Sequence, residues 1–272
     1  MRVLFLGRKP AASEALEYLL ERNVDVAAVV ARPRRQTVHW SPRLVDTAEK
    51  CGLPVRSVEH LYEILDGRRS DASIDLTDID LVLSFLYWKR IERPLIELGS
   101  IGCVNFHPAP LPEFRGLGGY NFAIYEEHTE WGVSAHFVEE TFDTGPLIEV
   151  RKFPINPAEE TAFTLEQRSQ KELLEVFRGV IDRAMEDGSL SGEPQDRGRY
   201  ISRSEFEEIR AIRPNDSAEE IHRKIRAFWY PPYPGAAIEL DGEEFTLVDR
   251  EILHRVGRRY HESGSSSGTS SP

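Results

Sequence analysis

Short, almost entirely apolar runs recur through the first hundred residues, and each precedes a stretch with helical periodicity. The apolar runs lie at residues 2–7, 24–31, 53–55 and 79–85, and the helical patterns at 12–20, 42–51, 58–65 and 91–98. A strand that is apolar at nearly every position is typical of a parallel sheet covered by helices on both faces. This alternation predicts an α/β fold with a mainly parallel, Rossmann-like sheet.

In the rest of the chain, strands and helices no longer alternate regularly. Two strands are expected at 131–138 and 146–154, and a long amphipathic helix at 162–186. Glycine and proline cluster between Asp187 and Pro194, which predicts a domain boundary there. We therefore expect a principal domain at 1–187, a small α+β C-terminal domain at 188–262, and a disordered Ser/Gly tail at 263–272. Within the C-terminal domain, Ser217 and Glu220 form a capping box, and Asp241-Gly242 predicts a hairpin turn.

Composition excludes several classes of function. The 272 residues carry a formal net charge of −12, which argues against a nucleic-acid partner. No apolar run is long enough to cross a membrane, and Cys51 and Cys103 lack the spacing of a metal site. The turn after residue 7 has no dinucleotide-binding glycine pattern. We expect a cytoplasmic protein with no metal, and we expect the basic clusters at 32–35 and 255–259 to be solvated loop charge.

Three polar side chains make chemical sense only together. Asn105 and His107 end an apolar strand, and residues two apart on a strand point to the same face. Asp143 follows the next expected strand, so it can lie beside His107 if those strands are neighbours. An amide donor, an imidazole and a carboxylate at one sheet edge suit acyl transfer. Taken singly, each has a structural explanation, and His136, in the middle of a hydrophobic strand, is expected to be structural.

The longer motif resembles a known family. The pattern N-x-H-P-x-x-L-P at Asn105–Pro112, then Arg115-Gly116 and D-x-G at Asp143, is similar to 10-formyltetrahydrofolate-dependent formyltransferases. The resemblance implies an N-formyltransferase that uses 10-formyltetrahydrofolate as co-substrate and needs no metal. It implies catalytic roles for Asn105, His107 and Asp143. It also implies that the loop after the fourth strand holds the folate pterin ring, at Phe85, Leu86, Tyr87 and Trp88.

Four branches of this family differ in their acceptor. A purine-pathway formyltransferase leaves the C-terminal domain unexplained, and a formyltetrahydrofolate hydrolase usually has an extra N-terminal domain. Methionyl-tRNA formyltransferase stays an alternative, although its C-terminal domain is basic. The stretches 83–91, 105–126 and 225–236 resemble the enzymes that formylate dTDP-linked amino-dideoxyhexoses for polysaccharide biosynthesis, with L-G-G-Y after Arg115-Gly116. A non-catalytic binder of folate or a sugar nucleotide is a further alternative.

The sugar branch assigns further residues. Arg8, Lys9 and Arg115 are expected to meet the diphosphate, because cationic side chains bind phosphate oxygens. Tyr120, Trp229, Tyr230 and Tyr233 offer flat faces for a pyrimidine base or sugar CH groups, or form a packed domain interface. The acceptor is then a dTDP-linked sugar with its amine at carbon 3 or 4, and the resemblance suggests a homodimer.

Overall fold

A computed structural model describes residues 1–33 and 40–254. The chain divides into two compact units. The first unit comprises Met1–Gly119, Glu130–Pro154 and Glu166–Ile201, and the second comprises Tyr120–Thr129, Ile155–Leu165 and the residues from Ser202 onward. The expected tail at 263–272 and the basic residues Arg34, Arg35 and Arg255–Arg259 lie outside the described residues.

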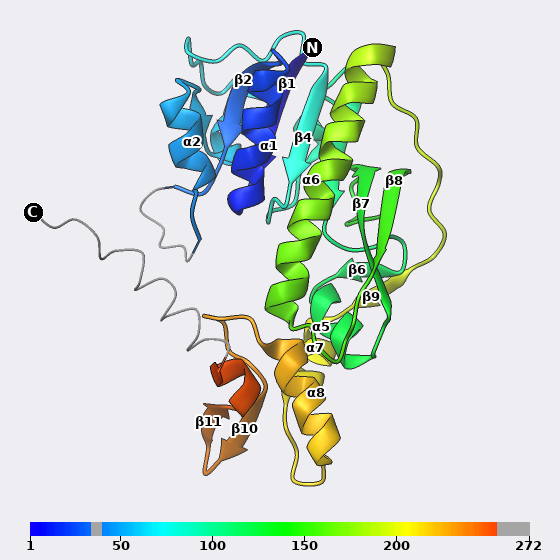
Figure 1. Ribbon diagram of the computed structural model, residues 1–272. Coiled ribbons are helices and arrows are strands. Elements are labelled where there is room, and N and C mark those ends of the chain that lie inside the picture. The colour runs from blue at the N-terminus through cyan, green and yellow to red at the C-terminus, as the bar shows by residue number, and fades with distance from the viewer. Residues whose placement is uncertain (34–39, 255–272) are drawn as a thin grey trace, which may run out of the picture. The chain divides into compact units, whose positions relative to one another are not determined.

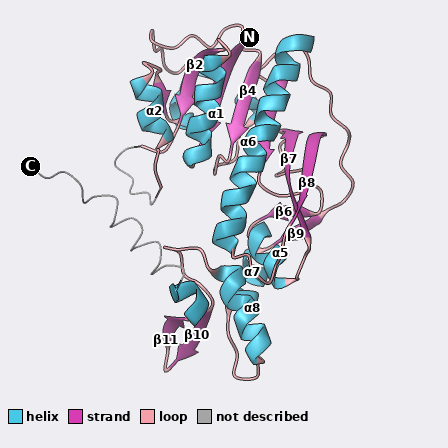
Figure 2. Ribbon diagram, in the orientation of Figure 1, coloured by secondary structure: helices cyan, strands magenta, loops and turns pink. Residues whose placement is uncertain are grey.

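A seven-stranded sheet forms the centre of the first unit (Figures 1 and 2). Its strands are β1 (Arg2–Gly7), β2 (Asp25–Val30), β3 (Val55–Arg56), β4 (Leu81–Phe85), β5 (Gly102–His107), β7 (Glu130–Phe137) and β8 (Leu147–Pro154). The spatial order is β3-β2-β1-β4-β5-β7-β8, with β1 to β5 parallel and β7 and β8 antiparallel. The predicted mainly parallel α/β sheet is confirmed.

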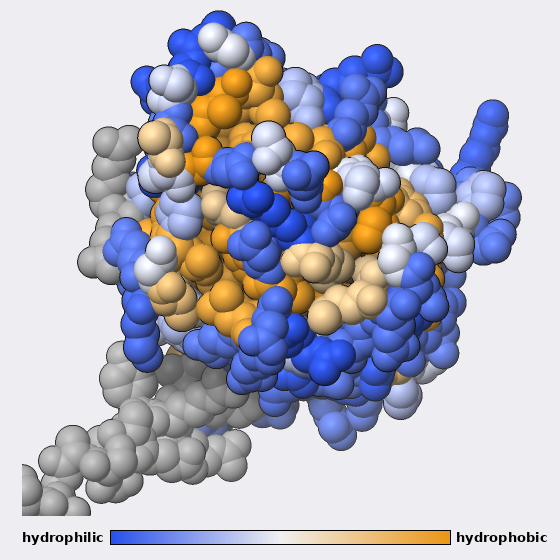
Figure 3. Space-filling view, turned by 90° about the horizontal axis from the view of Figure 1, so that it is seen from above, coloured by the Kyte–Doolittle hydropathy of each residue, from blue (hydrophilic) through white to orange (hydrophobic). Residues whose placement is uncertain are grey.

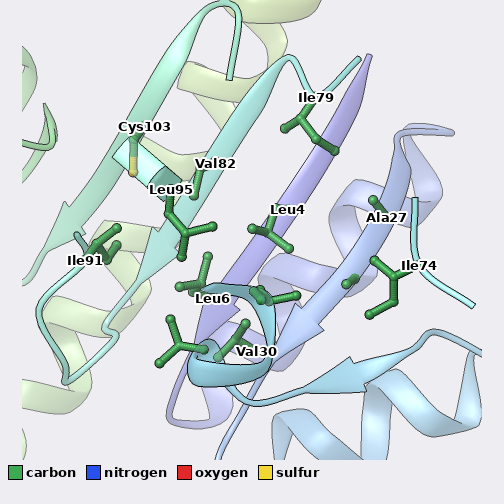
Figure 4. Close-up of a cluster of buried hydrophobic side chains, with 13 residues drawn as sticks. Leu4, Leu6, Ala27, Val30, Ile74, Ile79, Val82, Ile91, Leu95 and Cys103 are labelled. Atoms are coloured by element: carbon green, nitrogen blue, oxygen red, sulfur yellow. The ribbon is translucent and has the colours of Figure 1, made fainter. Parts of the chain in front are cut away.

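Helices cover both faces of this sheet, as the apolar strands predict. In the first unit they are α1 (Pro10–Glu21), α2 (Leu44–Lys50), α3 (Val58–Leu65), α4 (Arg93–Ile96) and most of α6 (Ala162–Asp187). On one face, Leu61 of α3 and Leu95 of α4 pack with Leu4, Leu6 and Val82 of the strands (Figure 4).

The alternate residues of the same strands form the core on the other face. Phe5, Phe85 and Phe106 lie there, and the ring of Phe177 from α6 packs edge-on against all three at centroid distances of 4.8–6.1 Å. Tyr18 of α1 also contacts Phe177. Aromatic rings at such distances and angles stabilise a core beyond the effect of their buried area.

The second unit is small and mixed in secondary structure. It contains α7 (Arg203–Arg210), α8 (Ala218–Phe228), a hairpin of β10 (Ala237–Leu240) and β11 (Glu243–Thr246), and nearly all of α5 (Gly119–Tyr125). Ser217 caps α8 by accepting a hydrogen bond from the Glu220 amide, as predicted. The Glu220 carboxylate does not complete a capping box, because it accepts from Tyr125 and Arg223 instead.

A short parallel pair lies beside the main sheet of the first unit: β6 (Phe114–Gly116) with β9 (Arg199–Ile201). On the face shown in Figure 3, hydrophobic and hydrophilic residues are interspersed. Within residues 1–33 and 40–254, no helix has the length and apolar character needed to span a membrane.

Candidate active site

A cavity of about 650 Å³ opens where β4 and β5 end in the first unit. Ser84, Asn105, His107, His136 and Asp143 all line it. The carboxyl ends of parallel strands form the usual binding crevice of such sheets. The structure thus brings Asn105, His107 and Asp143 together in one cavity.

Asn105 is held in one orientation by two neighbouring side chains. Its Oδ1 accepts a 2.7 Å hydrogen bond from the Ser84 hydroxyl, one strand away. Its Nδ2 lies 3.1 Å from Nε2 of His136, which stands directly opposite on β7. Because Nδ1 of His136 donates to the Phe137 carbonyl at 2.7 Å, Nε2 is free to accept from the amide. The second N–H of Asn105 takes no part in these contacts.

His107 and Asp143 form a close pair. Nδ1 of the imidazole lies 3.5 Å from Oδ1 of the carboxylate, and each side chain is 12% exposed. The other ring nitrogen lies 3.3 Å from the Phe114 carbonyl. The same carboxylate oxygen is 3.7 Å from His136, and the Gly116 amide donates to Oδ2 at 3.4 Å. The carboxylate thus orients the imidazole from one side.

The environment sets the charge of this pair. Burial lowers the pKa of His107 below its ordinary value, against the opposing attraction of Asp143. Burial alone would raise the pKa of Asp143, but the neighbouring His107 and the hydrogen bond from the Gly116 amide hold that pKa well below its usual range. At neutral pH the pair is therefore a neutral imidazole beside a carboxylate, which is the form of a general base.

Two local features hold the pair in place. The segment after His107 is tied down by the buried Ser134 of β7, whose hydroxyl donates to the Ala109 carbonyl and accepts from the Leu111 amide. Asp143 adopts a left-handed backbone with φ of 55°, which Asp tolerates better than most residues. Gly145 follows, where a Cβ would lie 1.9 Å from the Phe137 carbonyl oxygen.

The loop after β4 supplies much of the cavity wall. Leu86, Tyr87 and Trp88, predicted to hold the pterin, all line it. Leu86 has a φ of 55°, a strained conformation for a leucine that occurs mainly where function requires it. Phe85 differs from the prediction: its side chain is fully buried in the core against Phe106 and Phe177. It falls on the opposite face because side chains alternate along β4.

The basic residues expected to bind the acceptor differ in whether they line the cavity. Arg8 lines the cavity. Lys9 is buried, its ammonium 3.4 Å from Glu166, and burial lowers its pKa. Arg115 donates to Gln195 and to the Asp196 carbonyl, both at 2.8 Å.

The predicted aromatic residues Tyr120, Trp229 and Tyr230 belong to the second unit. There the Trp229 carbonyl accepts from the Phe163 amide, and the Tyr230 ring packs against Phe163 and Tyr233.

Three site residues were not singled out from sequence. His136 was expected to be structural, and Ser84 was given no role. Arg32 was expected to be solvated loop charge. All three line the cavity. Only the register of β5 with β7 places His136 opposite Asn105. If β5 and β7 had been paired, the alternation of side chains along the two strands would have indicated that His136 lies beside Asn105. In the described part of the chain, no cluster of three or more His, Cys, Asp or Glu side chains is arranged to bind a metal ion.

Comparison with known families gives two matches that together span most of the chain. The family model described as Formyl transferase matches residues 1–181, and the one described as Formyl transferase, C-terminal domain, matches residues 206–269. Methionyl-tRNA formyltransferase from Pseudomonas entomophila (strain L48) is 32% identical over 255 residues, which cover 91% of this chain and 79% of that protein.

Solved structures of similar fold are sugar-modifying and related enzymes. The N-formyltransferase from Helicobacter canadensis, in complex with folinic acid and dTDP-3-aminofucose, aligns with a TM-score of 0.69 at 24% identity, over 88% of this chain and 84% of its own. A 4-N formyltransferase from Francisella tularensis aligns with a TM-score of 0.72 at 18% identity, over 91% of this chain and 96% of its own. At these identities the likeness establishes the fold.

Proposed function

Because this chain belongs to the formyl transferase family, whose members are N-formyltransferases, we propose that it formylates a dTDP-linked amino sugar. The donor is 10-formyltetrahydrofolate, and the acceptor is the primary amine of a 3- or 4-amino-dideoxyhexose. The product is the N-formylamino sugar nucleotide. The single observation that carries the proposal is the meeting of Asn105, His107 and Asp143 in one cavity.

The geometry suits each step of the transfer. The acceptor amine attacks the formyl carbon, a C–N bond forms, and the carbonyl oxygen becomes an oxyanion. The Asn105 N–H that His136 does not use can donate to this oxyanion, and loss of one such donor typically costs about 2.7–4 kcal/mol of barrier. His107 accepts the proton of the attacking amine, oriented by Asp143. The intermediate then collapses, the bond to N10 of the folate breaks, and that nitrogen receives the proton that His107 took from the amine.

The folate fits the wall formed by Leu86, Tyr87 and Trp88. A pterin ring is flat and carries hydrogen-bonding edges, so it suits apolar side chains combined with exposed backbone groups. Leu86 has a left-handed backbone, with φ of 55°, while its amide still donates to the Phe106 carbonyl of β5 at 3.4 Å. We assign this loop, without Phe85, to the donor.

The net charge of the chain and one sequence motif favour a sugar acceptor over tRNA. With a formal net charge of −12, the chain is poorly suited to hold tRNA. Leu117-Gly118-Gly119-Tyr120 follows Arg115-Gly116, as in the sugar branch that the sequence resembles. The Helicobacter canadensis enzyme, whose structure contains dTDP-3-aminofucose, shares this fold. The second candidate, methionyl-tRNA formyltransferase, is favoured by the 32% identity to the Pseudomonas entomophila protein.

One assay separates these functions. Tetrahydrofolate release from 10-formyltetrahydrofolate is followed with dTDP-3-amino-dideoxyhexose, with the 4-amino isomer, and with initiator methionyl-tRNA. We expect release with one of the two sugars, and none with the Asn105→Ala, His107→Ala double variant. Formylation of the tRNA alone contradicts the proposed acceptor. Binding of both substrates with no release at all would show a non-catalytic binder.

The proposal extends to the setting of the enzyme. We place it in the cytoplasm, in the synthesis of sugar nucleotides for polysaccharides, and as a homodimer. Light scattering on a size-exclusion column measures the mass directly. A monomer at micromolar concentration would contradict the dimer without affecting the proposed reaction.

A further inference from the structure

Arg32 lines the active-site cavity and lies against two indole rings. Its guanidinium carbon is 4.8 Å from the ring centroid of Trp88 and 5.9 Å from that of Trp40. Both distances are within the range in which a cation is attracted to an aromatic face. Arg8 lines the same cavity. Three arginines, Arg8, Arg32 and Arg90, therefore line the cavity that holds Asn105 and His107, and Arg90 donates to the Glu140 carbonyl.

The charge of Arg32 is not neutralised within the described residues. No carboxylate there pairs with it, and its buried Nε has no hydrogen-bond partner among them. Residues 34–39, which follow it in the chain, contain no Asp or Glu. Three acidic groups line the same cavity, and each contacts a residue other than Arg32: Glu140 pairs with Arg93, Asp143 with His107, and Glu139 accepts a 3.5 Å hydrogen bond from the Thr144 hydroxyl.

The other basic residues first assigned to the diphosphate are already occupied. Lys9 contacts Glu166 and the face of Trp40, and Arg115 is bound to Gln195 and the Asp196 carbonyl. Arg32 is half-buried, but its Nε is fully buried without a hydrogen-bond partner in the described part of the chain, and burying an unpaired polar group is costly. Arg32 is therefore the stronger candidate for a ligand's negative charge.

We propose that Arg32, held by Trp88 and Trp40 and assisted by Arg8, anchors the diphosphate of the acceptor. This inference rests on the proposed function and names the residue that selects a nucleoside-diphosphate acceptor. The planar fork of a guanidinium matches two phosphate oxygens at once, which an ammonium cannot do. Stacking on the indoles restricts the side chain before the ligand arrives, so less entropy is lost on binding.

The test measures binding of four probes by calorimetry: inorganic pyrophosphate, dTDP, thymidine and folinic acid. The variants are Arg32→Gln, which keeps a flat polar side chain, and Arg32→Lys, which keeps the charge. Arg68→Gln is the matched control, because Arg68 is an exposed arginine paired with Asp66 on the surface. Melting temperatures equal to that of the wild type show that each variant is folded.

We expect Arg32→Gln to weaken dTDP and pyrophosphate binding by roughly 10- to 100-fold, the usual effect of losing a charge-assisted hydrogen bond. Thymidine and folinic acid should bind as in the wild type, Arg32→Lys should recover only part of the loss, and Arg68→Gln should change nothing.

Other outcomes would overturn the assignment. If wild type and Arg32→Gln bind pyrophosphate and dTDP equally, or if the wild type binds neither, Arg32 is not the anchor. If only folinic acid binding is weakened, the anion is a folate carboxylate. If the Arg32-dependent diphosphate binding is present but no amino sugar is formylated, this inference stands and the proposed acceptor fails.

Discussion

His107 is the residue whose protonation should control the reaction. Burial lowers its pKa below the ordinary 6.5, so the neutral base persists through the neutral range. The active form is lost only as pH falls through this lowered pKa. We therefore predict that kcat/KM declines on the acid side with a midpoint below pH 6.5, and the pH–rate profile measures it.

The Asp143→Asn variant tests how the carboxylate affects the pKa of His107. The carboxylate raises the pKa of His107, so its loss should move the acid midpoint to still lower pH while kcat falls. His60→Gln is the control, because His60 forms a second His–Asp pair, 3.0 Å from Asp71, that does not line the cavity. An acid midpoint above pH 6.5 in the wild type would contradict the dominance of burial.

Substitutions at Asn105 and Ser84 should lower kcat to different extents. Asn105→Ala removes the proposed oxyanion donor and should lower kcat by about 10²–10³. Ser84→Ala removes only the hydroxyl that orients the amide at 2.7 Å, so we expect a loss of roughly 5-fold, from about 1 kcal/mol. Steady-state kinetics with saturating folate measures both. Equal losses in the two variants would show that the hydroxyl itself takes part.

The β7–β8 connection is the element that delivers Asp143 to the site. Its Gly145 lies so close to β7 that an added Cβ would overlap the Phe137 carbonyl. We predict that Gly145→Ala lowers the free energy of unfolding by roughly 1–3 kcal/mol, and activity more strongly because Asp143 shifts. Urea denaturation and kcat measure the two effects.

Gly179 in α6 is the matched control for that substitution. A Cβ there meets only Arg183, at an ordinary 3.6 Å. Since alanine is about 1 kcal/mol better than glycine inside a helix, Gly179→Ala should stabilise the protein and leave kcat unchanged. Destabilisation by both variants to a similar extent would refute the steric argument at Gly145.

Charge is the property that belongs to the whole molecule. A formal net charge of −12 makes the folded chain repel itself, and added salt screens that repulsion. Ion pairs such as Arg68–Asp66 and Arg93–Glu97 are exposed on both sides, and exposed pairs contribute little to stability that salt could remove. We predict that the melting temperature rises between low and molar NaCl, which calorimetry measures. A fall would mean that the surface ion pairs outweigh the repulsion.

Local pattern was sufficient for most elements of the first unit. The apolar runs form β1, β2, β4 and β5, because a strand that is covered on both faces must be apolar at nearly every position. The expected strand at 53–55 is shorter and later, as β3 at Val55–Arg56. The capping serine at 217 was also predictable, since its hydrogen bond lies within one turn of helix.

The site was predictable only in part. Asn105, His107 and Asp143 were identified because they belong to one motif, and the structure brings them together. His136 lies in the middle of β7 as expected, but its place opposite Asn105 and the burial of Phe85 in the core depend on the pairing of neighbouring strands. The contact of Lys9 with Glu166 was not predictable, because the two residues lie far apart in the chain.

The sequence by itself determined the parallel α/β fold, the motif that carries the chemistry, and the family. These depend on periodicity and on spacing within short segments, which are visible without coordinates. Tertiary structure alone decided which of the described basic residues meet a carboxylate and which meet an aromatic face, as Lys9 and Arg32 show. The physical reason is that burial and ion pairing are properties of residues distant in the chain, brought together only when the strands pair and the helices cover them.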